Sequence, residues 1–353
     1  MSDRTAAAAG FVFAGVALAT ALGAWPTGMP RFVALGAAAL ATLAFLARRY
    51  GLIERELAAP VAALGGSGTV AGGLAGIAPG GDVVLPGVAA GTGMLVVAAA
   101  WADWQAIPRK RLLAQTRRAS GAAVVGLAGI ASIVLWGSLF LAAGRAIAGG
   151  PLSPVARTVV STAALGVGTV TVAAAYLVWS GVGSSYVDAR VPDRRELGYV
   201  VGGTALLLAA NLAISAAFGW LGVESTTHSL IRAARDDPEI LLALMPLSYL
   251  VVGPGEELLY RNVVQKSLRG EFSGAGAVVV ASVVFAAVHL PAYADPNGNA
   301  LALLNTLAVV FALSLILGAV YERTGNLAVP ALVHGSFNAV AFAVTYAEIA
   351  GIV

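Results

Sequence analysis

Long stretches without a charged side chain recur along the chain, and most are close to the length that crosses a lipid bilayer. A helix needs about 20 mostly apolar residues to span the hydrocarbon core. Charged residues make up 11% of the 353 residues and hydrophobic residues 59%, whereas soluble domains carry about 25% charged residues. The interior of a soluble fold cannot bury an apolar excess of this size. We therefore expect an all-α fold, a polytopic transmembrane helix bundle with about 10–11 spans.

The number of spans depends on residues 58–78, a stretch that is apolar but rich in glycine. Glycine is a poor helix former, so a loop or re-entrant segment is the alternative to a span. The positive-inside rule favours a span, because basic residues lie before this stretch, at 48–55, and after the next span, at 109–118. Two cytoplasmic loops require two crossings between them, which gives eleven spans and leaves ten as the alternative. The predicted spans are 6–24, 32–47, 58–78, 85–103, 119–144, 158–181, 197–222, 240–269, 274–290, 300–321 and 327–346.

The basic residues also predict the orientation of the chain. With eleven spans, 16 of the 21 Lys and Arg residues lie on one side of the membrane, which is the cytoplasmic side by the same rule. This places the N-terminus in the cytoplasm of a multi-pass protein of the cell membrane, whose first helix is retained and is not a cleaved signal peptide. Because the basic residues report orientation, we expect membrane lipid around the chain and no nucleic acid as a partner.

Charged side chains inside a span occur chiefly in the last third of the chain, and such groups mark function because they are costly in lipid. Glu256 and Glu257 lie near the middle of span 240–269, directly after a Pro-Gly pair that should loosen or kink the helix. Glu257 and Arg261 are four residues apart and share a helix face, which favours an ion pair. Glu256 has no such local partner, which makes it the better candidate for a general base.

Two of the three histidines follow in later spans. His289 ends the ninth predicted span, and His334 lies in the eleventh, four residues before Asn338. Residues four apart on a helix share a face, so His334 and Asn338 should point the same way. The third histidine, His228, falls in an outer loop with several charged residues and is interpreted as a solvated side chain.

The depth of each residue in the membrane indicates which side chains can meet. At a rise of about 1.5 Å per residue, Glu256 and His289 both lie roughly 20 Å from the inner end of their spans, so they can meet. His334 lies only about 10 Å deep by the same arithmetic. A tilted helix or an extended start near Pro330 would have to close that gap.

These residues suit the hydrolysis of a peptide bond inside the membrane. Glu256 and His289 could hold and deprotonate a water, while His334 and Asn338 could donate hydrogen bonds to the oxyanion. Alternatively, Glu256, His289 and His334 could bind a catalytic divalent metal such as zinc. The chain has no cysteine, which excludes thiolate ligands and a cysteine nucleophile. The expected substrate is a membrane-anchored protein or peptide.

Three motifs in order resemble the CPBP family of CAAX prenyl proteases and bacteriocin-processing enzymes, also called ABI proteins. They are EExxxR at 256–261, FxxxH at 285–289 and HxxxN at 334–338, and the resemblance covers roughly residues 240–346. The first motif of the family often ends in an aromatic residue, Arg and Gly, and here Asn262 replaces the Gly. The resemblance divides the chain into 1–235, a multi-span region without a recognised motif, and 236–353, a CPBP-like catalytic membrane domain.

The resemblance implies an intramembrane endopeptidase of the type II CAAX protease kind, with a glutamate or metallo mechanism. It makes Glu256 the water-activating base and implies that Glu257 is also needed. His289 would join Glu256 on the water or metal, and His334 and Asn338 would stabilise the oxyanion or complete the metal site.

Other classes of protein give alternative interpretations. The sequence GGSG at 65–68 fits the pattern around a rhomboid serine nucleophile, which would be Ser67. Intramembrane Glu and His residues also form proton relays in transporters and channels. A non-catalytic scaffold or immunity-type protein could retain the same residues. A protease requires the carboxylate and histidines around one reacting water, whereas a relay requires them strung out across the membrane.

Overall fold

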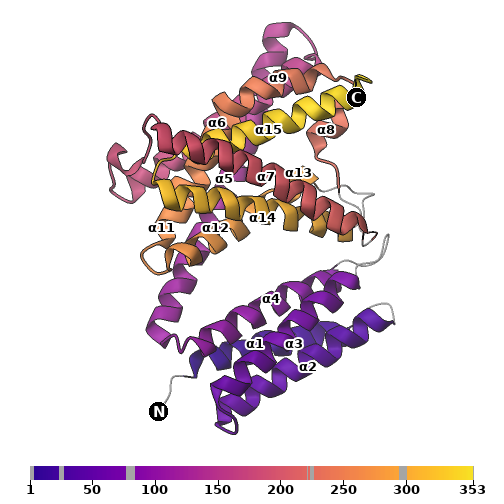
Figure 1. Ribbon diagram of the computed structural model, residues 1–353, viewed down its shortest axis with the longest axis vertical. Helices are drawn as coiled ribbons and strands as arrows, with labels where there is room; N and C mark the ends of the chain where they lie inside the picture. The colour runs from indigo at the N-terminus through magenta and orange to yellow at the C-terminus, as the bar shows by residue number, and fades with distance from the viewer. Residues whose placement is uncertain are drawn as a thin grey trace. The chain divides into compact units, whose positions relative to one another are not determined.

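The computed structural model describes residues 4–23, 28–76, 84–220, 222, 226–293 and 300–352, and every regular element in them is a helix (Figure 1). Within these residues, ten helices are long and apolar enough to cross a membrane. An eleventh predicted span, α12 (Gly274–Val288), is an apolar helix of 15 residues. The prediction of an all-α polytopic bundle with ten to eleven spans is confirmed.

The chain divides into two compact units. The N-terminal unit comprises Met1–Thr116 with Asp295–Leu304, and the C-terminal unit comprises Arg117–Ala294 with Asn305–Val353. These two units are defined by the packing of the chain. The division into 1–235 and 236–353 is based on sequence motifs, and it stays a prediction about where the function resides.

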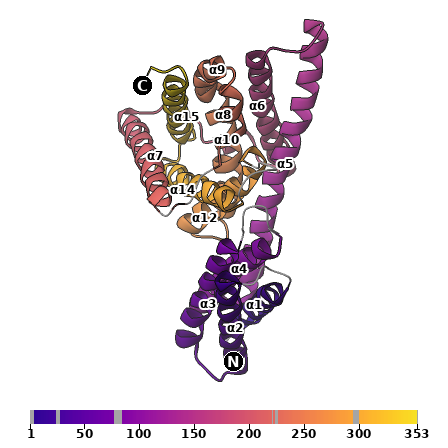
Figure 2. The same ribbon diagram turned by 90° about the vertical axis from the view of Figure 1, so that its right-hand side faces the viewer.

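The N-terminal unit contains four helices that lie side by side (Figure 2). Its core consists mostly of alanines around Phe45. Small residues are typical of membrane helix interfaces because they let backbones approach closely. The glycine-rich stretch 58–78 is helical as far as Ala75, and residues 77 and 78 lie outside the described residues. The helices are α1 (Thr5–Leu22), α2 (Met29–Tyr50), α3 (Arg55–Ala75) and α4 (Val84–Trp104).

The GGSG sequence lies in α3, where its glycines serve helix packing. A Cβ atom at Gly65 would lie 2.6 Å from the carbonyl oxygen of Ala37, and one at Gly66 would lie 2.9 Å from that of Gly93. Ser67 is exposed, and the chain has no histidine before His228. The pattern is therefore explained by close contact with α2 and α4, and no histidine base accompanies Ser67 in this part of the chain.

The remaining long helices are linked by short turns and short helical elements. Ser153 caps the N-terminus of one of them, because its hydroxyl accepts a hydrogen bond from the N–H of Ala156 at 3.2 Å. The long helices are α5 (Arg109–Ala148), α6 (Pro154–Trp179), α7 (Arg194–Trp220), α14 (Ala300–Thr324) and α15 (Ala328–Ile349). The short elements are η1 (Ser184–Tyr186), α8 (Ser229–Ala234) and α13 (Leu290–Tyr293).

The span predicted at 240–269 is one continuous helix whose winding changes along its length. Its two η segments are π-helices, in which the backbone hydrogen bonds run from i to i+5. They flank the Pro-Gly-Glu-Glu sequence, where the sequence predicts a loosened helix. The consecutive segments are α9 (Glu239–Leu247), η2 (Ser248–Val252), α10 (Gly253–Glu257), η3 (Leu258–Gln265) and α11 (Lys266–Leu268).

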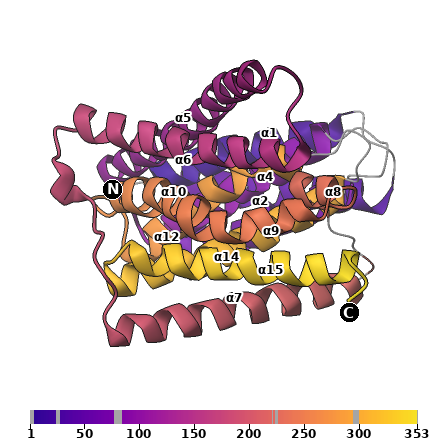
Figure 3. The same cartoon turned by 90° about the horizontal axis from the view of Figure 1, so that it is seen from above.

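Glycines allow α10 to pack against two neighbouring helices. A Cβ atom at Gly253 would lie 2.5 Å from the carbonyl oxygen of Ala331 in α15, and one at Gly255 would lie 2.7 Å from Oγ1 of Thr169 in α6. On its other sides, α15 packs against α9 and α7 (Figure 3). The carboxylates that follow these glycines are thus held close to α15.

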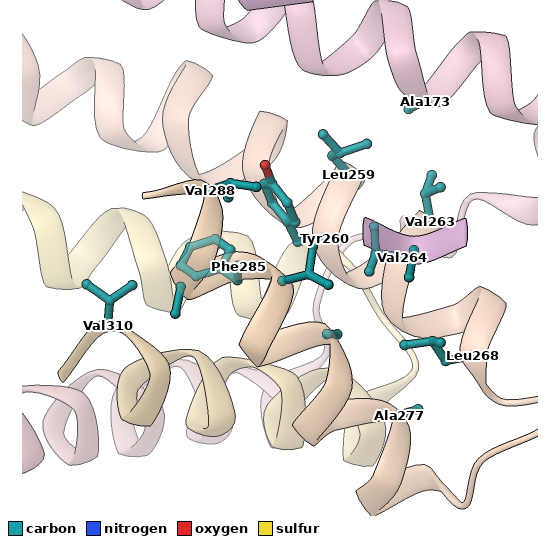
Figure 4. Packing of buried hydrophobic residues seen from close by; sticks show 14 residues of the cluster. Ala173, Leu259, Tyr260, Val263, Val264, Leu268, Ala277, Phe285, Val288 and Val310 are labelled. Carbon is teal, nitrogen blue, oxygen red and sulfur yellow. The ribbon is translucent and has the colours of Figure 1, made fainter. Parts of the chain in front are cut away.

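An apolar cluster lies beneath the same segment. Tyr260 and Phe285 meet edge to face with ring centroids 5.1 Å apart, in the middle of buried aliphatic side chains (Figure 4). Edge-to-face packing is a favourable arrangement of aromatic rings. This contact fixes η3 against α12, the helix that ends at His289.

Candidate active site

Glu257 forms the buried centre of a charged network. Its Oε2 atom lies 2.8 Å from Nε of Arg261, and both side chains are fully buried. The guanidinium of Arg261 also donates to Oγ of Ser314 at 3.0 Å and lies 4.9 Å from the ring centre of Phe285. Buried charges have to be paired to be tolerated. Arg261 is thus committed to Glu257, as the spacing of four residues leads one to expect.

The second carboxylate oxygen of Glu257 orients His334. Its Oε1 atom lies 3.0 Å from Nδ1 of His334 in α15. An ionised carboxylate can only accept hydrogen bonds, so Nδ1 of His334 carries the hydrogen. In a neutral ring Nε2 is then an acceptor, and it lies 4.0 Å from Oε2 of Glu256.

His289 reaches the same carboxylate from α12. It caps the C-terminus of this helix, and its Nδ1 lies 2.7 Å from the carbonyl oxygen of Phe285. A carbonyl oxygen only accepts, so Nδ1 of His289 is the donor. Its Nε2 lies 3.8 Å from Oε2 of Glu256. The structure therefore brings Glu256 and His289 together, as the sequence predicts.

Three hydrogen-bond acceptors converge at Glu256. Its Oε2 atom is buried and has no hydrogen-bond partner among the described residues. The Nε2 atoms of His289 and His334 both lie within 4.0 Å of it. Three acceptors that face one another are compatible when a donor, such as a water molecule or a proton, lies between them.

The depth calculation placed His334 too far from Glu256. The helix of His334 is regular from Ala328 onwards, so an extended start near Pro330 is not what brings them together. The rise of 1.5 Å per residue holds for an α-helix, whereas the eight residues of η3 that follow Glu257 are wound as a wider and shorter π-helix. Glu256 is therefore less deep than its position in the sequence indicates, by about 3 Å of the predicted difference of about 10 Å.

Asn338 lies one turn beyond His334 on α15 and is half-buried. This position is on the face of α15 that carries His334. Its assignment to the oxyanion stays a prediction.

The interpretation of His228 as a solvated residue is wrong. Its side chain is half-buried, accepts a hydrogen bond from the N–H of Leu230 at 3.0 Å, and packs against Tyr293 with ring centroids 4.9 Å apart. Burial, together with the charges of His289 and Arg232, lowers the pKa of His228 to about 4. Tyr293 lies 65 residues after His228 in the chain, so the local sequence around His228 gave no signal of this contact.

Asn262 is a second residue whose importance the sequence did not reveal. It is fully buried, accepts a hydrogen bond from the N–H of Asp188 at 2.9 Å and donates to the carbonyl of Tyr186 at 3.3 Å. The residue that replaces the family's glycine therefore ties η3 to the segment between α6 and α7.

The distances in the site can be compared with those around a bound metal ion and around a bound water. Among the described residues, no group of three His, Asp or Glu side chains is arranged to hold a metal. Ligands of tetrahedral zinc at about 2.1 Å lie about 3.4 Å from each other. Two atoms that share a water at about 2.8 Å lie about 4.5 Å apart. The distances of 3.8 and 4.0 Å from Glu256 to the two histidines fall between the two geometries.

A comparison with protein families finds one match in this part of the chain. Residues 238–340 match the family described as type II CAAX prenyl endopeptidase Rce1-like. The resemblance of this region to CAAX proteases is thereby confirmed, and the matched residues include all five candidate catalytic residues. No curated protein and no solved structure matches the chain.

Proposed function

We propose that this multi-pass membrane protein is an intramembrane endopeptidase that hydrolyses a peptide bond of a membrane-associated, CAAX-type substrate. The observation that carries the proposal is the convergence of His289 Nε2 and His334 Nε2 on the unpartnered Oε2 of Glu256. The match to the Rce1-like family supports the class of enzyme. We assign the protein to the cell membrane with a cytoplasmic N-terminus, as the basic residues predict.

In the proposed reaction, Glu256 and His289 hold the attacking water. Glu256 is the general base because the nearby cation, Arg261, is committed to Glu257. As the water oxygen attacks the carbonyl carbon, its proton passes to the Glu256 carboxylate. The peptide C–N bond then breaks, and Glu256 returns the proton to the leaving amine.

The remaining residues stabilise the charge that develops on the carbonyl oxygen. Asn338 offers an amide N–H₂ group on the same face of α15 as His334, and a donor aimed at an oxyanion lowers the barrier to acyl transfer. Glu257 holds His334 in a fixed orientation through its Nδ1 atom. In this role Glu257 is a positioning residue, and Arg261 in turn fixes Glu257.

The same geometry argues against the alternative of a proton-coupled transporter. A relay needs ionisable groups spread through the depth of the membrane. Here the two histidines approach one carboxylate oxygen to within 4.0 Å. The arrangement suits one reacting molecule, and the divalent metal expected as an alternative is a separate prediction, taken up in the Discussion.

The test is hydrolysis of a prenylated CAAX peptide by the purified protein in lipid vesicles, with the products identified by mass spectrometry. We expect cleavage with one oxygen atom taken from labelled water, and no cleavage by Glu256→Gln. The matched control is Glu239→Gln, which changes an exposed carboxylate in the same continuous helix. Binding of the peptide without cleavage by the unmodified protein would instead favour a scaffold.

A further inference from the structure

The segment between α6 and α7 forms hydrogen bonds with η3, with α14 and with the start of α15. Asn262 uses both ends of its amide there: Oδ1 accepts from the Asp188 N–H at 2.9 Å and from the Tyr321 hydroxyl at 3.2 Å, and Nδ2 donates to the Tyr186 carbonyl. A fully buried amide with this many partners is a rigid connection, because leaving any of them unpaired is costly.

Asp188 joins the same contacts to two further helices. Lys266 Nζ lies 2.8 Å from both of its carboxylate oxygens, and the Tyr321 hydroxyl donates to Oδ2 at 2.7 Å. The backbone carbonyl of Asp188 accepts from the N–H of Leu327, at the start of α15. Burial opposes ionisation of Asp188, but the hydrogen bonds from Lys266 and Tyr321 hold its pKa below the ordinary value.

We call this group the 188–262 clamp: Tyr186, Asp188, Asn262, Lys266 and Tyr321. It connects the end of η3 with α14 and with the start of α15.

The clamp lies close in sequence to both halves of the site. Asn262 follows Glu257 by five residues, and Leu327 precedes His334 by seven. A slip of one residue along an α-helix moves a side chain by about 1.5 Å and turns it by about 100°. Such a slip between η3 and α15 would break the 3.0 Å contact between Glu257 and His334.

We propose that Asn262 and Asp188 are positioning residues that fix the height of the Glu256–Glu257 helix against α15 and thereby align Glu256 with His334. The inference rests on the proposed function and extends it. The clamp is a feature of this chain, since its central amide stands where the related motif often has glycine.

The experiment combines kinetics with a distance measurement that does not depend on activity. The chain has no cysteine, so spin labels can be attached at cysteines introduced at Leu250 in η2 and Val344 in α15, which are 74% and 51% exposed. The test variants are Asn262→Gly and Asp188→Asn. Ser185→Ala, an exposed change in the same loop, is the control.

We expect Asn262→Gly to lower kcat by on the order of 10- to 100-fold with KM changed less than about twofold. The label-to-label distance distribution should shift or broaden in Asn262→Gly and in Asp188→Asn, and Ser185→Ala should leave both readouts unchanged. Unchanged kcat and distances in Asn262→Gly would overturn the inference. A loss of kcat with unchanged distances and lower thermal stability would also overturn it, because it indicates a general structural role. If the unmodified protein hydrolyses nothing, the proposed function fails while the distances still decide whether the clamp sets helix height.

Discussion

The N-terminal unit and the C-terminal unit use their buried positions differently. The core of α1–α4 is built from alanine and glycine, and its buried ion pair, Arg48 with Asp103 at 3.1 Å, joins residues near the ends of α2 and α4. The C-terminal unit buries Glu256, Glu257 and Arg261 in the middle of one helix. Buried charge in lipid is costly, and the first unit confines it to helix ends. The comparison indicates that the first unit is built for packing and the second for chemistry.

The largest effect should come from the carboxylate at the centre of the C-terminal unit. Glu256→Gln removes the general base while preserving shape, and we expect hydrolysis to fall by on the order of 10²–10⁴-fold. The measurement is single-turnover cleavage of the prenylated peptide. Asp103→Asn, at the buried pair of the N-terminal unit, should leave the cleavage rate of folded protein within about threefold if that unit has no part in the chemistry. A loss of rate in Asp103→Asn as large as that in Glu256→Gln would break the comparison.

A substitution that overpacks the N-terminal unit should lower its stability. Gly65→Ala places a Cβ atom 2.6 Å from the Ala37 carbonyl oxygen, and overpacking of this kind costs about 1–3 kcal/mol. Gly36→Ala in α2 has open space around the new Cβ atom and is the matched control. We expect thermal unfolding in detergent to occur at a lower temperature in Gly65→Ala only. Equal unfolding temperatures would show that close helix contact is not what stabilises this unit.

A smaller effect on stability should appear when the pH is lowered, because His228 lies half-buried in its neutral form. The pKa of His228 is lowered from 6.5 to about 4 when the protein folds. Between these values the unfolded chain binds the proton and the folded chain does not, so the contribution to stability is complete above about pH 6.5 and is lost as the pH falls towards 4. At pH 5 the loss should be about 1 kcal/mol, since solvent screens a half-buried ring.

The measurement is the unfolding temperature of the protein and of His228→Gln between pH 7 and pH 4.5. The variant should lose less stability on acidification than the unmodified protein. Parallel curves would contradict the assignment of His228 as a buried neutral ring.

The smallest effect should come from removal of metal ions. In the proposed mechanism Glu256 and His289 activate the water without a metal ion, so a chelator should change the cleavage rate by less than about twofold. The check is a rate measurement before and after dialysis against the chelator. Loss of activity that added zinc restores would establish the metallo mechanism instead.

Much of the fold and part of the site could be predicted from the sequence. Among the described residues, hydropathy located the ten helices that are long and apolar enough to cross a membrane, because lipid imposes a similar length on each of them. Charge counting correctly favoured a helix at α3, where the glycines argued against one. The meeting of Glu256 and His289 could be expected because both lie about equally many residues from the inner ends of their predicted spans.

The rest depended on features that a single sequence does not encode locally. The contact of His334 with the site could not be predicted from helical rise alone, and the π-helical winding of η3, which no simple periodicity predicts, accounts for part of the difference. The clamp required knowledge of which loop lies beside Asn262, since Asp188 is 74 residues away in the chain. His228 was misinterpreted because its charged neighbours in the sequence suggested solvent, whereas Tyr293 covers its ring.

The π-helical winding makes the helix Glu239–Leu268 shorter along its axis than an α-helix with the same number of residues. A π-turn contains more residues per unit of axial length than an α-turn, so η2 and η3 hold residues that α-winding would spread out along the axis. Rewinding either segment would lengthen the helix and rotate what lies beyond it, carrying Glu256 along and around the axis relative to His334. The two segments flank the carboxylates, so a change of winding in either one would move Glu256 relative to His334 without moving any helix out of the membrane.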